Sequence, residues 1–298
     1  MLDNVLDYFK RQDVEYEENY SIKKDSKVKI GGKAAVVAIP NTEDKLVRTV
    51  RYLARGGLKY KVVGAMSNIL PKDDYYNGIV VKTSKIDTYS LAEDKLTASC
   101  GCYIPALFRR IAALGYGGFA ELSSIPGVIG GCIYGNAGAF GKSFADIILN
   151  ADVYDIINDE IITVDRDELA LSYRDSAFKH KPWILLSASL RSVKASPTEA
   201  LKAIKLFSDI RKETQPTEPS LGSVFKRTGD VPVSLLIDKA GLKGYRVGDA
   251  AVSTKHAGFI VNIGNATARD FIVLTEIIKK RIFELYGVML EEEIEILS

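Results

Sequence analysis

The chain has 298 residues, 47% of them hydrophobic and 26% charged, which is typical of a folded protein of two or three domains. Its 40 basic and 38 acidic residues give a net charge of +2, so the composition gives no support to binding of nucleic acid or of an anionic membrane. The N-terminal residues lack the pattern of a secretory leader and no run of about 18 apolar residues occurs, so we expect a cytoplasmic protein without membrane insertion.

The first part of the chain predicts a βαβ unit. Apolar runs closed by glycine or proline mark the strands, and Asn41-Thr42-Glu43 followed by helical spacing marks the helix. The expected elements are a helix at 2–9, an extended segment at 14–18, a strand, glycine turn and strand at 28–39, a helix from 43 that stops at Gly56, and strands at 61–63 and 78–81.

Strands and helices alternate through the rest of the chain, and changes of pattern near residues 86 and 195 predict three domains, at 1–85, 86–195 and 196–298. The expected elements are strands at 87–90 and 96–100, a helix at 105–114, strands at 147–156 and 161–164, a short helix near Leu169, a strand at 183–191, helices from 197 and at 233–240, a strand at 259–262, a helix at 267–286 and a strand at 291–297.

The cysteines and histidines predict no metal centre. Cys100 and Cys102 are separated by one residue, unlike the C-x-x-C spacing of redox and zinc sites, and Cys132 leaves an odd number. His180 and His256 are too far apart in the sequence to form a cluster. We therefore expect reduced, structural thiols and no bound metal.

The stretch ELSSIPGVIGGCIYGNAGAFG, residues 121–141, is the strongest candidate for a ligand site. Six glycines lie among small and apolar residues, and a helix start is expected after Pro126. Exposed backbone amides at a helix start favour a pyrophosphate, although a buried glycine-rich turn gives the same pattern. The chain lacks the P-loop motif, and no G-x-G-x-x-G lies between a strand and a helix, so a different dinucleotide-binding fold is implied.

Within that stretch, IPGVIGGCIYGNAGAFG resembles the signature of the UDP-N-acetylenolpyruvoylglucosamine reductases, enzymes of peptidoglycan precursor synthesis. With the motifs below, the resemblance covers nearly all of residues 30–296. It implies an α+β chain in which a two-subdomain FAD-binding fold of the vanillyl-alcohol-oxidase type precedes a smaller α/β substrate-binding domain. It also implies FAD and NADPH as cofactors and a UDP-sugar as substrate, and we expect a monomer.

The resemblance assigns FAD binding to two loops. The loop Gly64 to Leu70 can be a capped turn in which Ser67 and Asn68 make local hydrogen bonds, but the family wraps the FAD pyrophosphate in Gly-x-Gly-Ser-Asn-x-Leu at this place. This chain has Met66 where glycine is usual, which narrows access to the backbone. The residues implied in cofactor binding are Gly64, Ala65, Met66, Ser67, Asn68, Ile69, Ser124, Ile125, Pro126, Gly127, Gly130, Gly131, Asn136, Ala137 and Gly138.

Three further motifs carry the catalytic residues that the resemblance implies. Arg174, in Tyr-Arg-Asp-Ser-Ala-Phe, and Glu293, in Leu-Glu-Glu-Glu-Ile, would stabilise charge, while Ser223, in Gly-Ser-Val-Phe-Lys, would donate a proton. Without the family match, Arg174 reads as a surface ion pair and Ser223 as a turn residue. Glu293 then reads as part of a solvated edge strand.

The resemblance assigns substrate binding less specifically than catalysis. The residues expected to hold the UDP-sugar are Tyr173, Lys226, Arg227, Lys255 and His256, each of which can equally face solvent. Thr228 stands where the family often has proline. The alternatives are an FAD-dependent oxidase of the same fold superfamily and a flavin-binding protein without turnover. Such oxidases frequently attach flavin through a histidine, and neither histidine lies in the two glycine loops.

Overall fold

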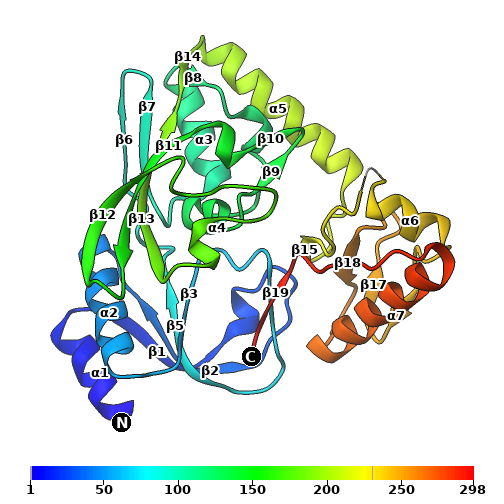
Figure 1. Ribbon diagram of the computed structural model, residues 1–298, viewed down its shortest axis with the longest axis horizontal. Coiled ribbons are helices and arrows are strands. Elements are labelled where there is room, and N and C mark those ends of the chain that lie inside the picture. The colour runs from blue at the N-terminus through cyan, green and yellow to red at the C-terminus, as the bar shows by residue number, and fades with distance from the viewer. Residues whose placement is uncertain (1, 230) are drawn as a thin grey trace. The chain divides into compact units, whose positions relative to one another are not determined.

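The computed structural model describes residues 2–229 and 231–298, and contacts divide the chain into two compact units (Figure 1). The first unit comprises the segment up to Glu18, Val36–Ala65 and Gly78–Ile210, and the second comprises Asn19–Ala35, Met66–Asn77 and Arg211–Ser298. Neither unit is one contiguous stretch. The division into contiguous domains at 1–85, 86–195 and 196–298 therefore stays a prediction beside this contact-based description.

The first unit contains most of a four-stranded sheet in the order β1-β2-β5-β3. Strands β3 and β5 run parallel, and Thr42 caps α2 by accepting a hydrogen bond at 3.2 Å from the Lys45 amide. The elements are α1 (Leu2–Arg11), β1 (Glu15–Ser21), β2 (Lys33–Ile39), α2 (Glu43–Arg55), β3 (Tyr60–Val63) and β5 (Tyr76–Lys82). The predicted order of strand, helix and strand is present as β2, α2 and β3, and β5 lies between β2 and β3 in the sheet.

A second, antiparallel sheet of five strands, in the order β12-β11-β13-β7-β6, completes the first unit (Figure 1). Its buried face joins one hydrophobic core with α2, α3 and α4. The further elements are β6 (Tyr89–Ala92), β7 (Lys95–Ser99), α3 (Ile104–Ala113), β8 (Tyr116–Gly117), η2 (Ala120–Leu122), α4 (Ile129–Tyr134), β9 (Gly138–Ala139), β10 (Lys142–Ser143), η3 (Phe144–Asp146), β11 (Ile148–Asp155), β12 (Glu160–Asp165), η4 (Ala177–Lys179), β13 (Trp183–Arg191), β14 (Val193–Lys194) and α5 (Pro197–Thr214).

Two predicted elements are wrong, and both contain buried apolar residues outside regular structure. Leu169 is fully buried but lies in a turn, not in a short helix. Val28 and Ile30 are buried in the core of the second unit, yet residues 28–30 form no strand. Burial of an apolar side chain depends on tertiary packing, so an apolar run alone does not specify strand or helix.

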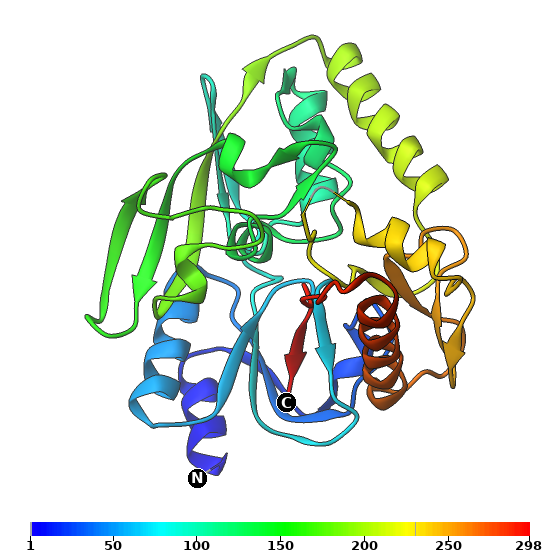
Figure 2. The same ribbon diagram turned by 45° about the vertical axis from the view of Figure 1, so that its right-hand side comes forward.

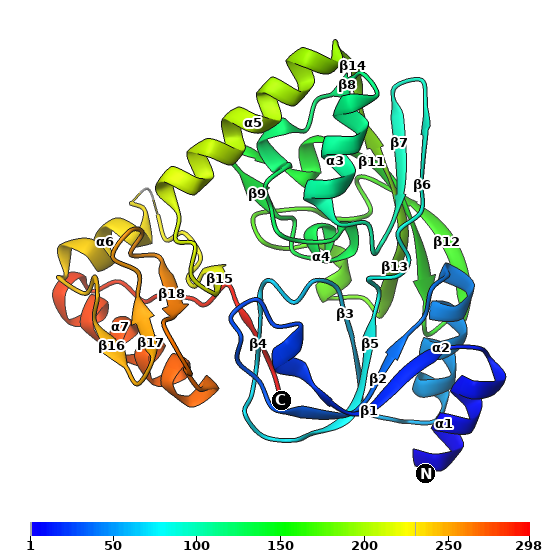
Figure 3. The same ribbon diagram turned by 180° about the vertical axis from the view of Figure 1, so that it is seen from behind.

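The second unit has its own core beneath a four-stranded sheet in the order β15-β18-β17-β16, to which helices α6 and α7 contribute (Figure 3). Helix α7 begins at a capping box between Thr267 and Asp270 and ends at Gly287, whose φ is +66°. The elements are η1 (Ile22–Lys24), β4 (Ile69–Pro71), β15 (Ser220–Ser223), α6 (Val233–Lys239), β16 (Arg246–Val247), β17 (Ala250–Val252), β18 (Phe259–Asn262), α7 (Ala268–Tyr286) and β19 (Glu295–Leu297).

The last strand, β19, pairs in parallel with β4 inside the second unit, and Figure 2 shows it ending at the C-terminus. The register joins Glu295 to Ile69 and Leu297 to Pro71. This pairing brings the tail of the chain beside the loop that follows Met66. In the part of the chain that the structure describes, no helix is both long and apolar enough to cross a membrane.

Candidate functional site

Helix α4 begins at Ile129, close to the helix start expected after Pro126, and its first amides divide into two kinds. The N–H groups of Ile129 and Gly130 donate to the carbonyls of Cys102 and Cys100 at 3.0 and 2.8 Å. Among the described residues, no backbone carbonyl accepts from the N–H of Gly131. Gly131 is also exposed, and a Cβ built on it would meet no atom within 4 Å. Gly131 is therefore the glycine of the pair that offers bare backbone to a ligand.

Other glycines of the predicted cofactor loops are required by packing rather than by ligand access. A Cβ on Gly130 would lie 3.1 Å from the Cys100 carbonyl oxygen, and one on Gly64 would lie 2.4 Å from Cγ2 of Val128. A Cβ on Gly138 would lie 2.8 Å from the Lys142 carbonyl oxygen. Close packing at these three glycines fixes the course of the loops, and the exposed backbone at Gly131 fits a cradle for a pyrophosphate.

Arg174 lies against the segment 136–138, which the sequence assigned to the cofactor. Its guanidinium donates to the carbonyls of Asn136 and Gly138, each at 3.4 Å. The φ angles of Arg174 and Asn136 are +56° and +39°, a conformation that costs non-glycine residues energy and that clusters at functional sites. The first unit thus brings the predicted catalytic arginine to the second predicted cofactor loop.

Two side chains fasten the Arg174 segment, and sequence reasoning missed both roles. Asn136 is buried, donates through Nδ2 to the Ser172 carbonyl at 2.7 Å, and accepts at Oδ1 from the Ala145 amide at 3.0 Å. Ser176 donates through Oγ to the Tyr134 carbonyl at 2.6 Å. The side chain of Asn136 is therefore engaged with protein on both of its polar atoms. The presence of a serine two residues after Arg174 was the signal in the sequence that could have indicated such a hydrogen bond.

In the second unit, the segments that carry Ser223 and Glu293 lie side by side. Ser223 ends β15, and the residues after it pair in antiparallel fashion with residues 291–293 through a bridge between Phe225 and Glu292. The Glu293 amide donates to the Val224 carbonyl at 2.8 Å. The fold of this unit thus brings together the segments that carry two of the predicted catalytic residues.

The loop after Gly64 carries Met66 in the left-handed region, at a φ of +50°, and buries its side chain to 3% exposure. Such a φ suits the glycine that the family resemblance leads one to expect here. Ser67, Asn68 and Ile69 follow, each half-buried. At Met66 the strained backbone therefore destabilises the fold, while burial of the apolar side chain stabilises it.

Replacement of Met66 separates these two effects. Met66→Ala loses the burial and keeps the strain, whereas Met66→Gly loses the burial and relieves the strain. In the interior of a helix or strand, glycine lowers stability by about 0.5–1 kcal/mol relative to alanine. At this left-handed position we expect the opposite order, with a free energy of unfolding about 1 kcal/mol higher for Met66→Gly than for Met66→Ala. Urea denaturation of both variants measures the order. A less stable glycine variant would contradict the strain at this residue.

The predicted substrate-binding residues differ in their surroundings. Lys226 forms an ion pair with Glu291, and the Lys255 ammonium donates to the Lys212 carbonyl near the end of α5. Burial lowers the pKa of His256, whose Nδ1 accepts from the Gly258 amide at 3.2 Å, so the imidazole is neutral near pH 7 and offers no positive charge to a diphosphate. Tyr173 and Arg227 are exposed.

The cysteines are buried and free of disulfides. Burial raises the pKa of the Cys102 thiol to about 12, so it stays protonated at neutral pH. The thiol donates to the Thr88 carbonyl at 3.2 Å. A packing role for this residue agrees with the expectation of reduced, structural thiols.

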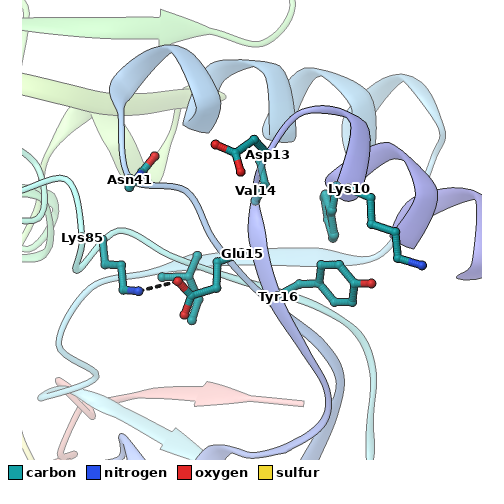
Figure 4. Close-up of a pocket in the computed structure, with 9 residues that line it drawn as sticks. Lys10, Asp13, Val14, Glu15, Tyr16, Asn41 and Lys85 are labelled. Carbon is teal, nitrogen blue, oxygen red and sulfur yellow. Dashed lines mark hydrogen bonds and ion pairs between the residues drawn. The ribbon is translucent and has the colours of Figure 1, made fainter.

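A pocket of about 390 Å³ near the N-terminus contains none of the predicted site residues (Figure 4). An ion pair between Lys85 and Glu15 lies at one side, and Lys10 and Tyr16 lie at the other (Figure 4). Its lining offers neither glycine backbone nor the motifs described above, so it does not enter the candidate site.

Comparison with known protein families gives two matches. The C-terminal domain of UDP-N-acetylenolpyruvoylglucosamine reductase matches residues 215–297, and an FAD binding domain matches residues 34–165. Similar curated proteins named UDP-N-acetylenolpyruvoylglucosamine reductase include one from Caldicellulosiruptor saccharolyticus, 36% identical over 96% of this chain and 93% of the relative. Another, from Thermosipho melanesiensis, is 39% identical over 90% of this chain and 91% of the relative.

A solved structure agrees with these matches. The crystal structure of UDP-N-acetylenolpyruvylglucosamine reductase (MurB) from Thermus caldophilus superposes with a TM-score of 0.80 and 30% identity, covering 96% of this chain and 99% of that one. The predicted α+β chain, with an FAD-binding fold of the vanillyl-alcohol-oxidase type and a further C-terminal domain, is confirmed. From the sequence similarity, the family matches and the fold together, this chain belongs to the UDP-N-acetylenolpyruvoylglucosamine reductase family.

Proposed function

We propose that this chain reduces UDP-N-acetyl-enolpyruvoylglucosamine to UDP-N-acetylmuramate with NADPH, in peptidoglycan precursor synthesis, and that it does so as a cytoplasmic monomer. The observation that carries the proposal is the pairing of the Ser223 and Glu293 segments, fixed by the 2.8 Å hydrogen bond from the Glu293 amide to the Val224 carbonyl. A proton donor and an acid on adjacent segments suit a reduction that ends in protonation.

The reaction adds a hydride to C3 and a proton to C2 of an enol ether that carries a carboxylate, and it oxidises NADPH. FAD, when bound, supplies the transfer of hydride from NADPH to the substrate. Addition at C3 leaves an electron pair at C2, and that charge spreads onto the carboxylate. The residues of the chain must therefore stabilise a developing anion and then deliver one proton.

Arg174 and Glu293 are proposed to stabilise that anion. A guanidinium offers fixed, paired donors to a carboxylate, and a protonated carboxyl adds another. Arg174 is already held in a conformation of positive φ beside residues 136–138. Donors that are held in place before the reaction need little reorganisation when charge develops, and the contacts of Arg174 with Asn136 and Gly138 support such a role.

Ser223 is proposed to protonate C2. A hydroxyl is a weak acid, so it acts through position and through the basicity of the anion that it faces. Ser223 is the last residue of β15 and pairs with Phe259 of β18, and Gly222 before it has a φ of +79°. The glycine allows the chain to turn at this point, which sets the direction of the serine that follows.

The cofactor is proposed to rest on the open backbone at Gly131 and on the two loops named from the sequence. The residues that complete this proposal are Gly64, Ala65, Met66, Ser67, Asn68, Ile69, Ser124, Ile125, Pro126, Gly127, Gly130, Asn136, Ala137 and Gly138. Tyr173, Lys226, Arg227, Lys255 and His256 are proposed to contact the UDP-sugar. For Lys226 and Lys255 this requires exchange of the protein partners that they have in the structure.

The proposal is tested by anaerobic addition of NADPH to the purified, flavin-containing protein. We expect the flavin absorbance to bleach without any UDP-sugar present, because reduction by NADPH precedes the step that uses the sugar. A flavin that resists NADPH but is bleached by an alcohol or a free sugar would support the oxidase instead. A flavin that resists every reductant of these classes would support binding without turnover.

A further inference from the structure

The backbone of Glu293 is held from two directions within the second unit. Its N–H donates to the Val224 carbonyl at 2.8 Å, next to Ser223. Its carbonyl accepts a hydrogen bond at 2.9 Å from Nδ2 of Asn68. One partner thus belongs to the strand of the proposed proton donor, and the other belongs to the loop that follows Met66.

The second of these bonds extends an existing ladder. Strands β4 and β19 pair in parallel from Ile69 and Glu295 onward, and the Glu295 amide donates to the Asn68 carbonyl at 2.9 Å (Figure 3). Two residues before Glu295, the backbones no longer pair directly, and the side chain of Asn68 reaches Glu293 in their place. The side chain of Asn68 therefore continues the contact between the two segments as far as Glu293, the proposed catalytic acid.

The other attachments of this segment are a further backbone hydrogen bond, from the Lys226 amide to the Glu291 carbonyl at 2.8 Å, and two ion pairs. Glu291 pairs with Lys226, and Glu292 pairs with Lys279 at 3.2 Å. The Glu291 side chain is 71% exposed, and ion pairs at such places constrain the backbone weakly. The hydrogen bond from Asn68 acts on the carbonyl of Glu293 itself, so it bears directly on where that residue lies.

We propose that Asn68 is a positioning residue for Glu293, and this inference rests on the role given to Glu293 under the proposed function. Sequence reasoning placed Asn68 among the residues that hold FAD. In the structure its amide donor is directed at the carbonyl of Glu293, which ties the cofactor loop to the acid. Loss of this donor displaces Glu293 relative to Ser223, and a displacement of about 1 Å can slow a reaction about 10²-fold.

Asn68→Asp removes the donor and keeps the shape of the side chain. We expect the backbone amides of residues 293–295 to exchange faster with deuterated solvent, because the end of the ladder opens more often. We expect reoxidation of the reduced flavin by the enolpyruvyl substrate to slow about 10-fold to 100-fold. Flavin content is measured on the same samples, and the rate of reoxidation is compared per bound flavin. Asn68→Gln keeps a donor on a longer arm and should recover part of both properties.

Asn262→Asp is the matched control. Asn262 also donates through Nδ2 to a backbone carbonyl, that of Val28 at 3.0 Å, and its Oδ1 accepts from Gly264 and Ala266. The substitution removes the same kind of bond in the same unit, with backbone partners other than Glu293. It should change the two half-reactions in equal proportion or not at all, and leave exchange at 293–295 unchanged.

A double variant separates this inference from the proposed function. If Asn68 acts through Glu293, then Asn68→Asp combined with Glu293→Gln should reoxidise no more slowly than Glu293→Gln alone. If the two substitutions together slow reoxidation by the product of their separate effects, Asn68 does not act through Glu293. If Asn68→Asp loses flavin while exchange at 293–295 is unchanged, the side chain of Asn68 acts on the cofactor. Either result would overturn the positioning role. If Glu293→Gln alone has no effect on reoxidation, the catalytic role of Glu293 fails, whereas the exchange measurement still decides whether Asn68 holds the segment.

Discussion

Ser223→Ala is expected to slow reoxidation of the flavin by the enolpyruvyl substrate by about 10²-fold to 10⁴-fold, the loss typical of a general acid. Reduction of the flavin by NADPH should be nearly unchanged, because no proton is delivered to C2 in that step. Anaerobic stopped-flow absorbance measures the two rates separately. Ser223→Cys should lose less, since a thiol can donate a proton from almost the same position.

Ser220→Ala is the control for this prediction. Ser220 lies on the same strand and pairs with Val261, so the substitution tests the effect of losing a hydroxyl from β15. It should leave both half-reactions as they are. An equal decrease of both rates in Ser223→Ala would show that the serine supports the structure rather than the protonation.

Gly131→Val is expected to abolish retention of FAD while the protein remains folded. A pyrophosphate needs the open space at the Cα of Gly131 and its N–H, which donates to no backbone carbonyl of the described residues, and a valine side chain would fill that space. The flavin-to-protein absorbance ratio after gel filtration measures retention, and thermal unfolding of the flavin-free protein measures the fold. A folded variant with its full complement of flavin would contradict the cradle at Gly131.

Substitutions of two neighbouring glycines, Gly130 and Gly135, serve as comparisons for Gly131→Val. A Cβ on Gly130 would lie 3.1 Å from the Cys100 carbonyl oxygen, so Gly130→Ala should lower the melting temperature of flavin-free protein as well as flavin content. A Cβ on Gly135 would meet its nearest atom, the Gly131 carbonyl oxygen, at 3.8 Å, which is ordinary contact. Gly135→Ala should therefore leave both properties unchanged.

The elements that the sequence predicted best are those with local signals. Thr42 and Thr267 cap helices at the places expected, because capping depends on a few adjacent residues. The helix near Leu169 and the strand at 28–30 were wrong, because in both places apolar residues are buried from turns by packing with distant segments. Local pattern carries no information about that packing.

The candidate site shows the same division at the level of side chains. Motifs locate Arg174, Ser223 and Glu293 on the chain, and the structure adds which segments hold them. The side chains of Asn68 and Asn136 donate hydrogen bonds to backbone carbonyls of other segments. The sequence could not show this, because those partners lie 225 and 36 residues away. A residue's type in a motif leaves open whether it contacts the ligand or the protein.

Anaerobic addition of UDP-N-acetyl-enolpyruvoylglucosamine to protein that NADPH has reduced tests the proposed activity in a single turnover. We expect the oxidised flavin spectrum to return and one product to form per flavin, heavier than the substrate by one hydride and one proton. If the flavin stays reduced with this substrate and is reoxidised only when oxygen is admitted, the chain is not acting as the reductase proposed here.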